Sequence, residues 1–474
     1  MAVVLNRSIL SLKIGEWFKL EANETVAWSS DNANVLIDEK GWVVALRDRL
    51  RPDGQATITA TGSIGTATCK ITIVPWRAEK HNVAIEKVYT STHVQGLLPS
   101  KLNNKIVVAD GVELYEAING DIGNLKHLAT FPHNLANIPI IETPFGFFAW
   151  TSNGYSGANT TAHIYRSTDL VNWVVEKETD FSGLYHSMDW YFDGTTLFVY
   201  AAEYGTDLDH RFKLMRGAFT SASTGTWTTI KEFYSQNEYK NSGLSPSIRH
   251  FHLVTVDKSN GYVYAGSGDS DHECFLLLST DNGETFKVLG TGSQEYRILS
   301  VWFTEKYIYW NMDSALNQRV FRLAKANLTA QAPGNDLKEE VAALVNGSHW
   351  FHCWAKDEYV DDIVVMGSAP EGQQRDWLSR LFSIKELPDE SVEVSELIAL
   401  PSSTPDVYDN GITMYAQLEP KFFHDGRLYV RGRYTNPPAS SSNNWLSGLM
   451  RFNIHRKMSK PKKREWRETY NFIN

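Results

Sequence analysis

The side chains that could carry chemistry gather in short phrases rich in histidine and arginine. The phrase Arg249-His250-Phe251-His252 places two imidazoles at positions i and i+2, and His349-Trp350-Phe351-His352 places two more beside a tryptophan. Imidazoles at i and i+2 point to the same face of a strand, so such a pair could ligate a metal. Arginine pairs with carboxylates and aromatic rings pack on sugars, so the same set also suits an acidic glycan.

These phrases begin apolar runs, so we expect them at the starts of strands that share one rim of the fold. The alternative left open is that each histidine only satisfies a strand end beside its neighbour. The candidate ligand-binding residues are Arg249, His250, His252, Arg297, His349, His352, His186 and Trp350.

A glycine-rich loop, Gly266-Ser267-Gly268-Asp269-Ser270-Asp271-His272-Glu273, holds three acidic side chains. Carboxylates are calcium ligands, so Asp269, Asp271 and Glu273 form a calcium candidate; the alternative is a hairpin loop with solvated acids. The chain has no phosphate-binding loop, dinucleotide fingerprint, nucleophile elbow or zinc spacing. We therefore predict no cofactor and name no catalytic residue.

The elements that position these residues are predicted by a phrase that recurs from about residue 80 onward. It is a short aromatic and β-branched strand after a turn, usually followed by a second strand that ends polar. Its seven copies are Ile106–Ala109, Phe147–Trp150, Leu197–Tyr200, Tyr262–Ala265, Tyr307–Trp310, Ile363–Met366 and Leu428–Arg431. A strand-only repeat of roughly 40–50 residues is typical of propeller blades. We predict a β-propeller over residues 76–455 with seven blades, six or eight being left open, and few helices, the best candidate being 336–344.

One hairpin signal is sharper than the others. Ser279-Thr280-Asp281-Asn282-Gly283-Glu284-Thr285-Phe286 follows an apolar run and predicts a tight turn, since Asp281 can bond nearby amides and Gly283 can take positive φ. The pattern resembles the Asp-box (BNR repeat) of sialidase-like propellers, and a copy without the glycine occurs at 167–173. The resemblance implies an outer hairpin of a blade, away from the axis, and says nothing of chemistry.

Residues 1–75 read as a separate small β-sandwich of short strands. The order of four short motifs resembles the bacterial Ig-like group 2 (BIG2) module. The motifs are Leu12 with Gly15, Val26-x-Trp28-Ser29-Ser30-Asp31, Gly41-x-Val43-x-Ala45 and Gly54-x-Ala56-x-Ile58-x-Ala60. The resemblance implies a docking or spacer unit of bacterial surfaces and phage virions. The fold class is therefore all-β, an Ig-like sandwich followed by a propeller and, at 456–474, a basic tail.

Composition narrows the function classes. The net charge is −9, which argues against broad nucleic-acid binding, and no apolar run approaches the ~18 residues of a membrane helix. The N-terminus does not resemble a signal peptide, and the three cysteines, an odd number far apart in the chain, predict buried free thiols. We expect a protein made in a reducing host cytoplasm without export.

A module of surface type on a chain without an export signal fits a phage product released by lysis. The preferred prediction is a virion protein of the tail or capsid, oligomeric within its assembly, in which the sandwich docks. The propeller then binds another virion protein or a host-surface glycan.

The alternatives are a sialidase-like glycoside hydrolase or lyase and an intracellular scaffold. Sialidases need three arginines, a tyrosine nucleophile with a glutamate, and an aspartate acid. Arg249, Arg297 and Tyr415 could supply part of that set. Asn137-Ile138-Pro139, however, lacks the arginine of the family's Arg-Ile-Pro phrase. An enzyme is therefore the less favoured reading.

Overall fold

The computed structural model describes residues 2–454 except for several short segments. These are 14–16, 33–34, 46–53, 75–82, 92–93, 101–104, 119–122, 153–160, 184–185, 224, 314–317, 345–350, 358–359, 368–377, 388, 402–426 and 436–444. Within this part of the chain no helix is long and apolar enough to cross a bilayer.

The N-terminal region is a two-sheet β-sandwich. One sheet has the order β1-β7-β6-β3 and the other β2-β5-β4. The strands are β1 (Ile9–Lys13), β2 (Trp17–Lys19), β3 (Ala27–Ser30), β4 (Val35–Ile37), β5 (Trp42–Ala45), β6 (Gly54–Gly62) and β7 (Gly65–Val74). Alternate residues of the strands, among them Val43, Ile58 and Ile71, face one another in a buried core. The two-layer packing is that of a sandwich, and the BIG2 relationship remains a prediction.

After the sandwich, the described strands form seven further sheets in sequence order. Six of these are four-stranded antiparallel meanders, and the seventh holds β33, β34 and β8. The first three are β9 (Val94–Ser100), β10 (Lys105–Asp110), β11 (Glu113–Ala117), β12 (Leu125–Thr130); β13 (Asn134–Thr143), β14 (Gly146–Ser152), β15 (Ala162–Ser167), β16 (Val174–Thr179); and β17 (Met188–Phe192), β18 (Leu197–Ala202), β19 (Lys213–Phe219), β20 (Thr226–Glu232). The next three are β21 (His250–Asp257), β22 (Tyr262–Gly268), β23 (Phe275–Ser279), β24 (Lys287–Thr291); β25 (Ile298–Phe303), β26 (Tyr307–Met312), β27 (Gln318–Ala324), β28 (Glu339–Leu344); and β29 (Phe351–Asp357), β30 (Val360–Gly367), β31 (Leu378–Glu386), β32 (Val392–Pro401).

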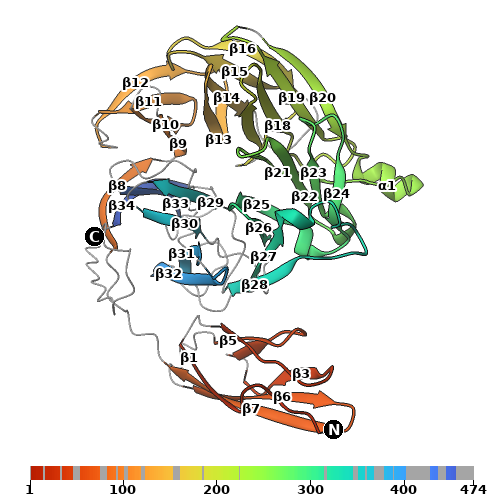
Figure 1. The fold of residues 1–474 in the computed structure, drawn as a ribbon. Helices are drawn as coiled ribbons and strands as arrows, with labels where there is room; N and C mark the ends of the chain where they lie inside the picture. Colours follow the sequence, from red (N-terminus) through yellow and green to blue (C-terminus); the bar gives the residue numbers. More distant parts are fainter. Residues whose placement is uncertain are drawn as a thin grey trace.

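The ring is closed by strands from the two ends of this region. β8 (Val83–Ser91) pairs antiparallel with β34 (Trp445–Ile454), which in turn pairs with β33 (Arg427–Thr435). The first strands of the six four-stranded sheets contact one another in succession, and the sheets follow each other around a common centre (Figure 1). This arrangement is a β-propeller, and each of the seven predicted repeat copies lies in a sheet of its own. The predicted seven blades are therefore confirmed for the described residues.

The blades hold together through apolar layers between neighbouring sheets. One buried cluster joins Tyr200 and Phe212 of the third blade to Phe251 and Val263 of the fourth, and another joins the fourth to the fifth. The aromatic and β-branched repeat phrase supplies these layers, because both faces of a blade are covered and must be apolar.

The Asp-box turn joins the third and fourth strands of the fourth blade, as predicted for an outer hairpin. Asp281 accepts the amide of Thr285 at 2.9 Å, and Ser279 Oγ accepts the amide of Gly283 at 2.8 Å. Gly283 has φ +91°, and a side chain there would collide with Ile230 of the preceding blade. In the copy without glycine, Leu170 takes positive φ beside the capping Asp169.

The sandwich touches the fifth blade through a charged contact. Arg319 of β27 pairs with Asp38 of the sandwich, and both side chains are buried. Lys40 of the sandwich pairs with Glu295 and lies 3.5 Å from Glu340 of β28. The N-terminal unit is thus fixed to the propeller by an ion network.

The candidate helix over 336–344 was wrong, and the helix that the structure describes lies elsewhere. Residues 339–344 form the outer strand β28, because pairing with β27 overrides weak helical periodicity. The described α-helix is α1 (Gln236–Ser242), with short 3₁₀ turns η2 (Asp271–Glu273), η3 (Gln294–Tyr296) and η4 (Lys325–Asn327). The Ser235 and Glu238 capping box, an S-x-x-E phrase, is the sequence signal that would have located α1. The tail at 456–474 lies outside the described residues.

Candidate functional site

The candidate site forms where strand ends of two consecutive blades, the fourth and the fifth, meet. His250 is the first residue of β21, Asp269 follows the end of β22, and Arg297 precedes β25. Antiparallel neighbours bring the start of β21 and the end of β22 to the same edge, and a bridge between Ser267 and Arg297 joins the next blade. The predicted convergence of strand starts therefore holds for this part of the ring, while the ligand-binding role remains a prediction.

Asp269 is the centre of the site. Arg249 Nη1 donates to its Oδ2 at 2.8 Å, and Arg297 Nη2 approaches its Oδ1 at 2.9 Å. Arg297 also pairs with Asp313 at 2.9 Å. Burial raises the pKa of Asp269, but the histidines beside it outweigh that effect and hold the pKa well below its usual range. The carboxylate is therefore ionised and oriented by two arginines.

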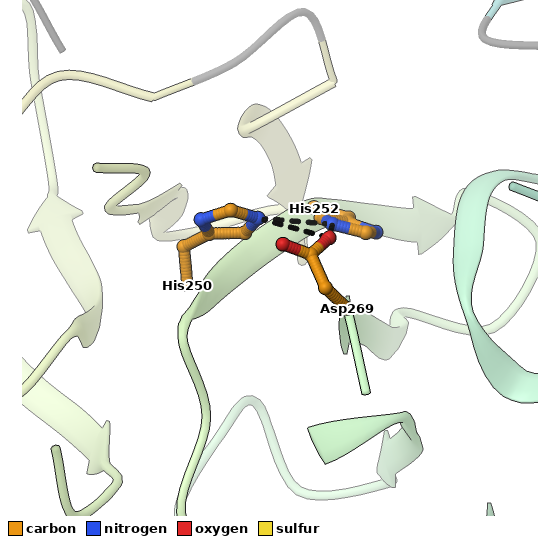
Figure 2. Close-up of side chains that lie close together, drawn as sticks. All are labelled: His250, His252 and Asp269. Atoms are coloured by element: carbon orange, nitrogen blue, oxygen red, sulfur yellow. Dashed lines mark hydrogen bonds and ion pairs between the residues drawn. The ribbon is translucent and has the colours of Figure 1, made fainter. Parts of the chain in front are cut away.

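Two imidazoles lie beneath this carboxylate, both 2 % exposed. His250 Nε2 is 3.2 Å from His252 Nε2, and the two atoms are 3.7 and 3.6 Å from Asp269 Oδ1 (Figure 2). His250 Nδ1 lies 2.7 Å from the carbonyl oxygen of Gly205 and must donate its proton to it. Burial lowers the pKa of His250 and so favours the neutral ring, in which Nε2 has the lone pair because Nδ1 donates to Gly205.

Access to the site is from the arginine side. The side chains of Arg249, Arg297 and Asp269 are 37 %, 28 % and 22 % exposed. Arg249 Nε is buried without a hydrogen-bond partner in the described packing. Tyr204 packs on His250 with ring centroids 4.0 Å apart.

A second polar cluster lies nearby on the third blade. His210 Nε2 is 3.2 Å from Glu203 Oε2 and 4.0 Å from Asp180 Oδ2. Lys213 Nζ already donates to Asp180 at 2.7 Å. A cation of the chain thus occupies this cluster, and Glu203 is almost fully buried.

The three acids of the glycine-rich loop do not converge. Glu273 is buried and accepts the amide of Ser270 at 2.9 Å, and Asp271 accepts Gln294 Nε2 at 2.9 Å. Asp269 turns instead to the arginines. Because each carboxylate has its own partner, the calcium candidate is corrected to a structural loop that presents Asp269.

The remaining predicted residues are placed as follows. His186 forms an isolated bridge with Leu253 beside the site, and burial lowers its pKa to about 4. His352 lies in β29 but its side chain is not among the described ones, and His349, Trp350 and Tyr415 lie outside the described residues. Sequence reasoning missed the roles of Tyr204, Gly205 and Asp313, since they join the site only through blade packing.

Comparison with known proteins gives fold-level similarities alone. No protein-family model and no curated protein matches the chain. Among solved structures it is similar to a Trypanosoma rangeli sialidase mutant displaying trans-sialidase activity, at 12 % identity and TM-score 0.43, covering 79 % of this chain and 60 % of that one. It is also similar to Trypanosoma rangeli sialidase itself, at 10 % identity and TM-score 0.41, covering 78 % and 60 %. A chain of the mitotic checkpoint complex matches at 9 % identity and TM-score 0.44, covering 81 % and 95 %.

The chain thus spans about three fifths of the sialidases it matches. At these scores the similarities carry nothing about activity, and the propeller is defined by the strand pairing of this chain.

Proposed function

We propose that the protein is a non-enzymatic attachment protein whose propeller binds a carboxylate-bearing glycan at the mouth beside Asp269. The observation that carries this proposal is the arginine pair. Arg249 and Arg297 flank one carboxylate and remain partly exposed. Guanidinium groups held in place by protein carboxylates can pair with an acidic sugar at little cost in side-chain entropy.

Binding is favoured over cleavage by the state of the carboxyl groups. Glycoside hydrolysis needs a carboxylic acid that holds its proton near neutral pH. The low pKa of Asp269 removes it as a proton donor. Among the described carboxyls, burial clearly raises the pKa of Glu340, but that residue lies on outer strand β28 at the sandwich contact.

The test is a titration of the full chain with glucuronate and N-acetylneuraminate oligosaccharides, with a neutral galactose oligosaccharide for comparison. We expect binding of an acidic oligosaccharide that weakens at least about tenfold in Arg249→Ala, since one charge-assisted pair contributes about 1.5–3 kcal/mol. The matched control is Arg211→Ala, because Arg211 is paired with Glu238 on α1. Equal affinity in wild type and Arg249→Ala would contradict the proposal.

A reducing-sugar release assay on the same oligosaccharides separates binding from hydrolysis. Release of product that persists with purified wild type and disappears in Asp269→Asn would replace the binding proposal with an enzyme.

The proposed setting is a phage virion made in the host cytoplasm, with the sandwich docked to another virion protein in an oligomeric assembly. The order of a surface-type module before a propeller supports it. Mass spectrometry of purified particles from a producing strain checks it: we expect the protein at particle stoichiometry, and its absence from intact particles would refute the setting.

A further inference from the structure

The three donor atoms beneath the mouth have the spacing of a metal site. His250 Nε2, His252 Nε2 and Asp269 Oδ1 lie 3.2, 3.7 and 3.6 Å from one another. Donors of a tetrahedral zinc ion with bonds of about 2.0–2.2 Å are separated by roughly 3.3–3.6 Å. The triad therefore has close to the spacing of one face of such a tetrahedron.

We propose that His250, His252 and Asp269 bind one divalent transition-metal ion, best fitted by Zn²⁺, with the fourth position open to an exchangeable ligand. Two imidazoles and one carboxylate are a set that zinc and related ions accept, whereas calcium and magnesium prefer oxygen alone.

The surroundings of the triad support this assignment. His250 donates Nδ1–H to Gly205, the arrangement that fixes a metal-binding imidazole with Nε2 free. Arg249 and Arg297 orient the carboxylate, and each carboxylate oxygen retains a second lone pair.

Charge decides the nature of the fourth ligand. Asp269 and Asp313 are already balanced by Arg249 and Arg297, so a bound dication leaves uncompensated positive charge at the mouth. An anion in the open position, such as hydroxide or a ligand carboxylate, removes that excess. The metal-site proposal is independent of the glycan proposal, because zinc binding is measured with the metal alone.

The experiment is calorimetric titration of the EDTA-dialysed full chain with ZnCl₂, together with Co²⁺ absorption spectra. We expect one strong site per chain and the visible bands of tetrahedral cobalt. The variants His252→Ala and Asp269→Asn should each weaken zinc at least about tenfold and abolish those bands. His210→Ala is the matched control, because it removes a histidine from the neighbouring cluster already occupied by Lys213.

Three results would overturn the site. These are no stoichiometric zinc binding tighter than micromolar, unchanged affinity in folded Asp269→Asn, or loss of binding in His210→Ala. Far-UV circular dichroism establishes folding, and Asp269→Asn serves if His252→Ala fails to fold, since Asn keeps the volume of Asp.

Discussion

The contact between the sandwich and the propeller predicts a large effect from one substitution, Arg319→Ala. Arg319 and Asp38 are 7 % and 4 % exposed, and Arg319 Nη1 also lies 3.5 Å from Glu295. Removing one partner of a buried pair costs about 3–5 kcal/mol, because the other charge stays buried without compensation. In the variant, Asp38 still accepts hydrogen bonds from the backbone amides of Lys40 and Trp42, at 2.8 and 2.9 Å. We therefore expect a loss of unfolding free energy at the lower end of this range, about 3 kcal/mol.

The pH dependence of this loss follows from Glu340. Burial raises the pKa of Glu340, whereas Arg319 and Lys40 lower it, so removal of Arg319 raises it further. A carboxyl with a raised folded pKa destabilises the fold above its unfolded pKa, and the cost declines as the pH falls through the folded pKa. The difference in unfolding free energy between wild type and Arg319→Ala should therefore become smaller as the pH falls from 7 to 5.

The assay is urea unfolding followed by tryptophan fluorescence, with each transition fitted separately because the chain has two units. Lys40→Ala is the control, since Lys40 is 39 % exposed and an exposed pair contributes no more than about 1 kcal/mol. If Arg319→Ala lowers the unfolding free energy no more than Lys40→Ala does, the buried ion pair does not stabilise the protein as argued.

Three further outcomes are expected. Burial lowers the pKa of His186 to about 4 in the fold, against an ordinary value near 6.5, so up to about 3 kcal/mol of stability should be lost as the pH falls from 6.5 to 4. His186→Asn should reduce this dependence of the unfolding free energy on pH, and an unchanged dependence would contradict the reasoning. Gly283→Ala should cost up to about 1 kcal/mol more than Gly292→Ala in thermal unfolding. Both glycines have positive φ, but a Cβ added at Gly283 would lie 2.6 Å from Ile230 Cδ1, which must shift, whereas a Cβ at Gly292 meets nothing; equal losses would count against the blade contact. Burial raises the pKa of Cys274 to about 12, so iodoacetamide followed by peptide mapping should modify this thiol only after unfolding.

The repeat made most of the propeller predictable. The aromatic phrase marks the second strand of each of the six four-stranded blades, because that strand is covered on both faces, as at Phe147–Trp150 and Tyr307–Trp310. Ring closure was not predictable from the phrase, since β8 precedes the first copy and pairs with β34 at the far end of the chain. The expectation of buried free thiols is confirmed for Cys69 and Cys274.

The candidate site was predictable in its strand starts and not in its centre. Arg249, His250, His252 and Arg297 stand out by type, and alternation along a strand places the imidazole pair on one face. Asp269 looked like one of three loop acids, and its pairing with both arginines depends on how neighbouring blades pack. Such non-local packing leaves no local pattern in the sequence.

The most direct measurement of the central claim is a crystal structure of the full chain with a bound acidic oligosaccharide. We predict a sugar carboxylate that accepts hydrogen bonds from Arg249 and Arg297 at the mouth of the site. An oligosaccharide bound on the sandwich or on the outer hairpins, with the mouth left to solvent, would contradict it.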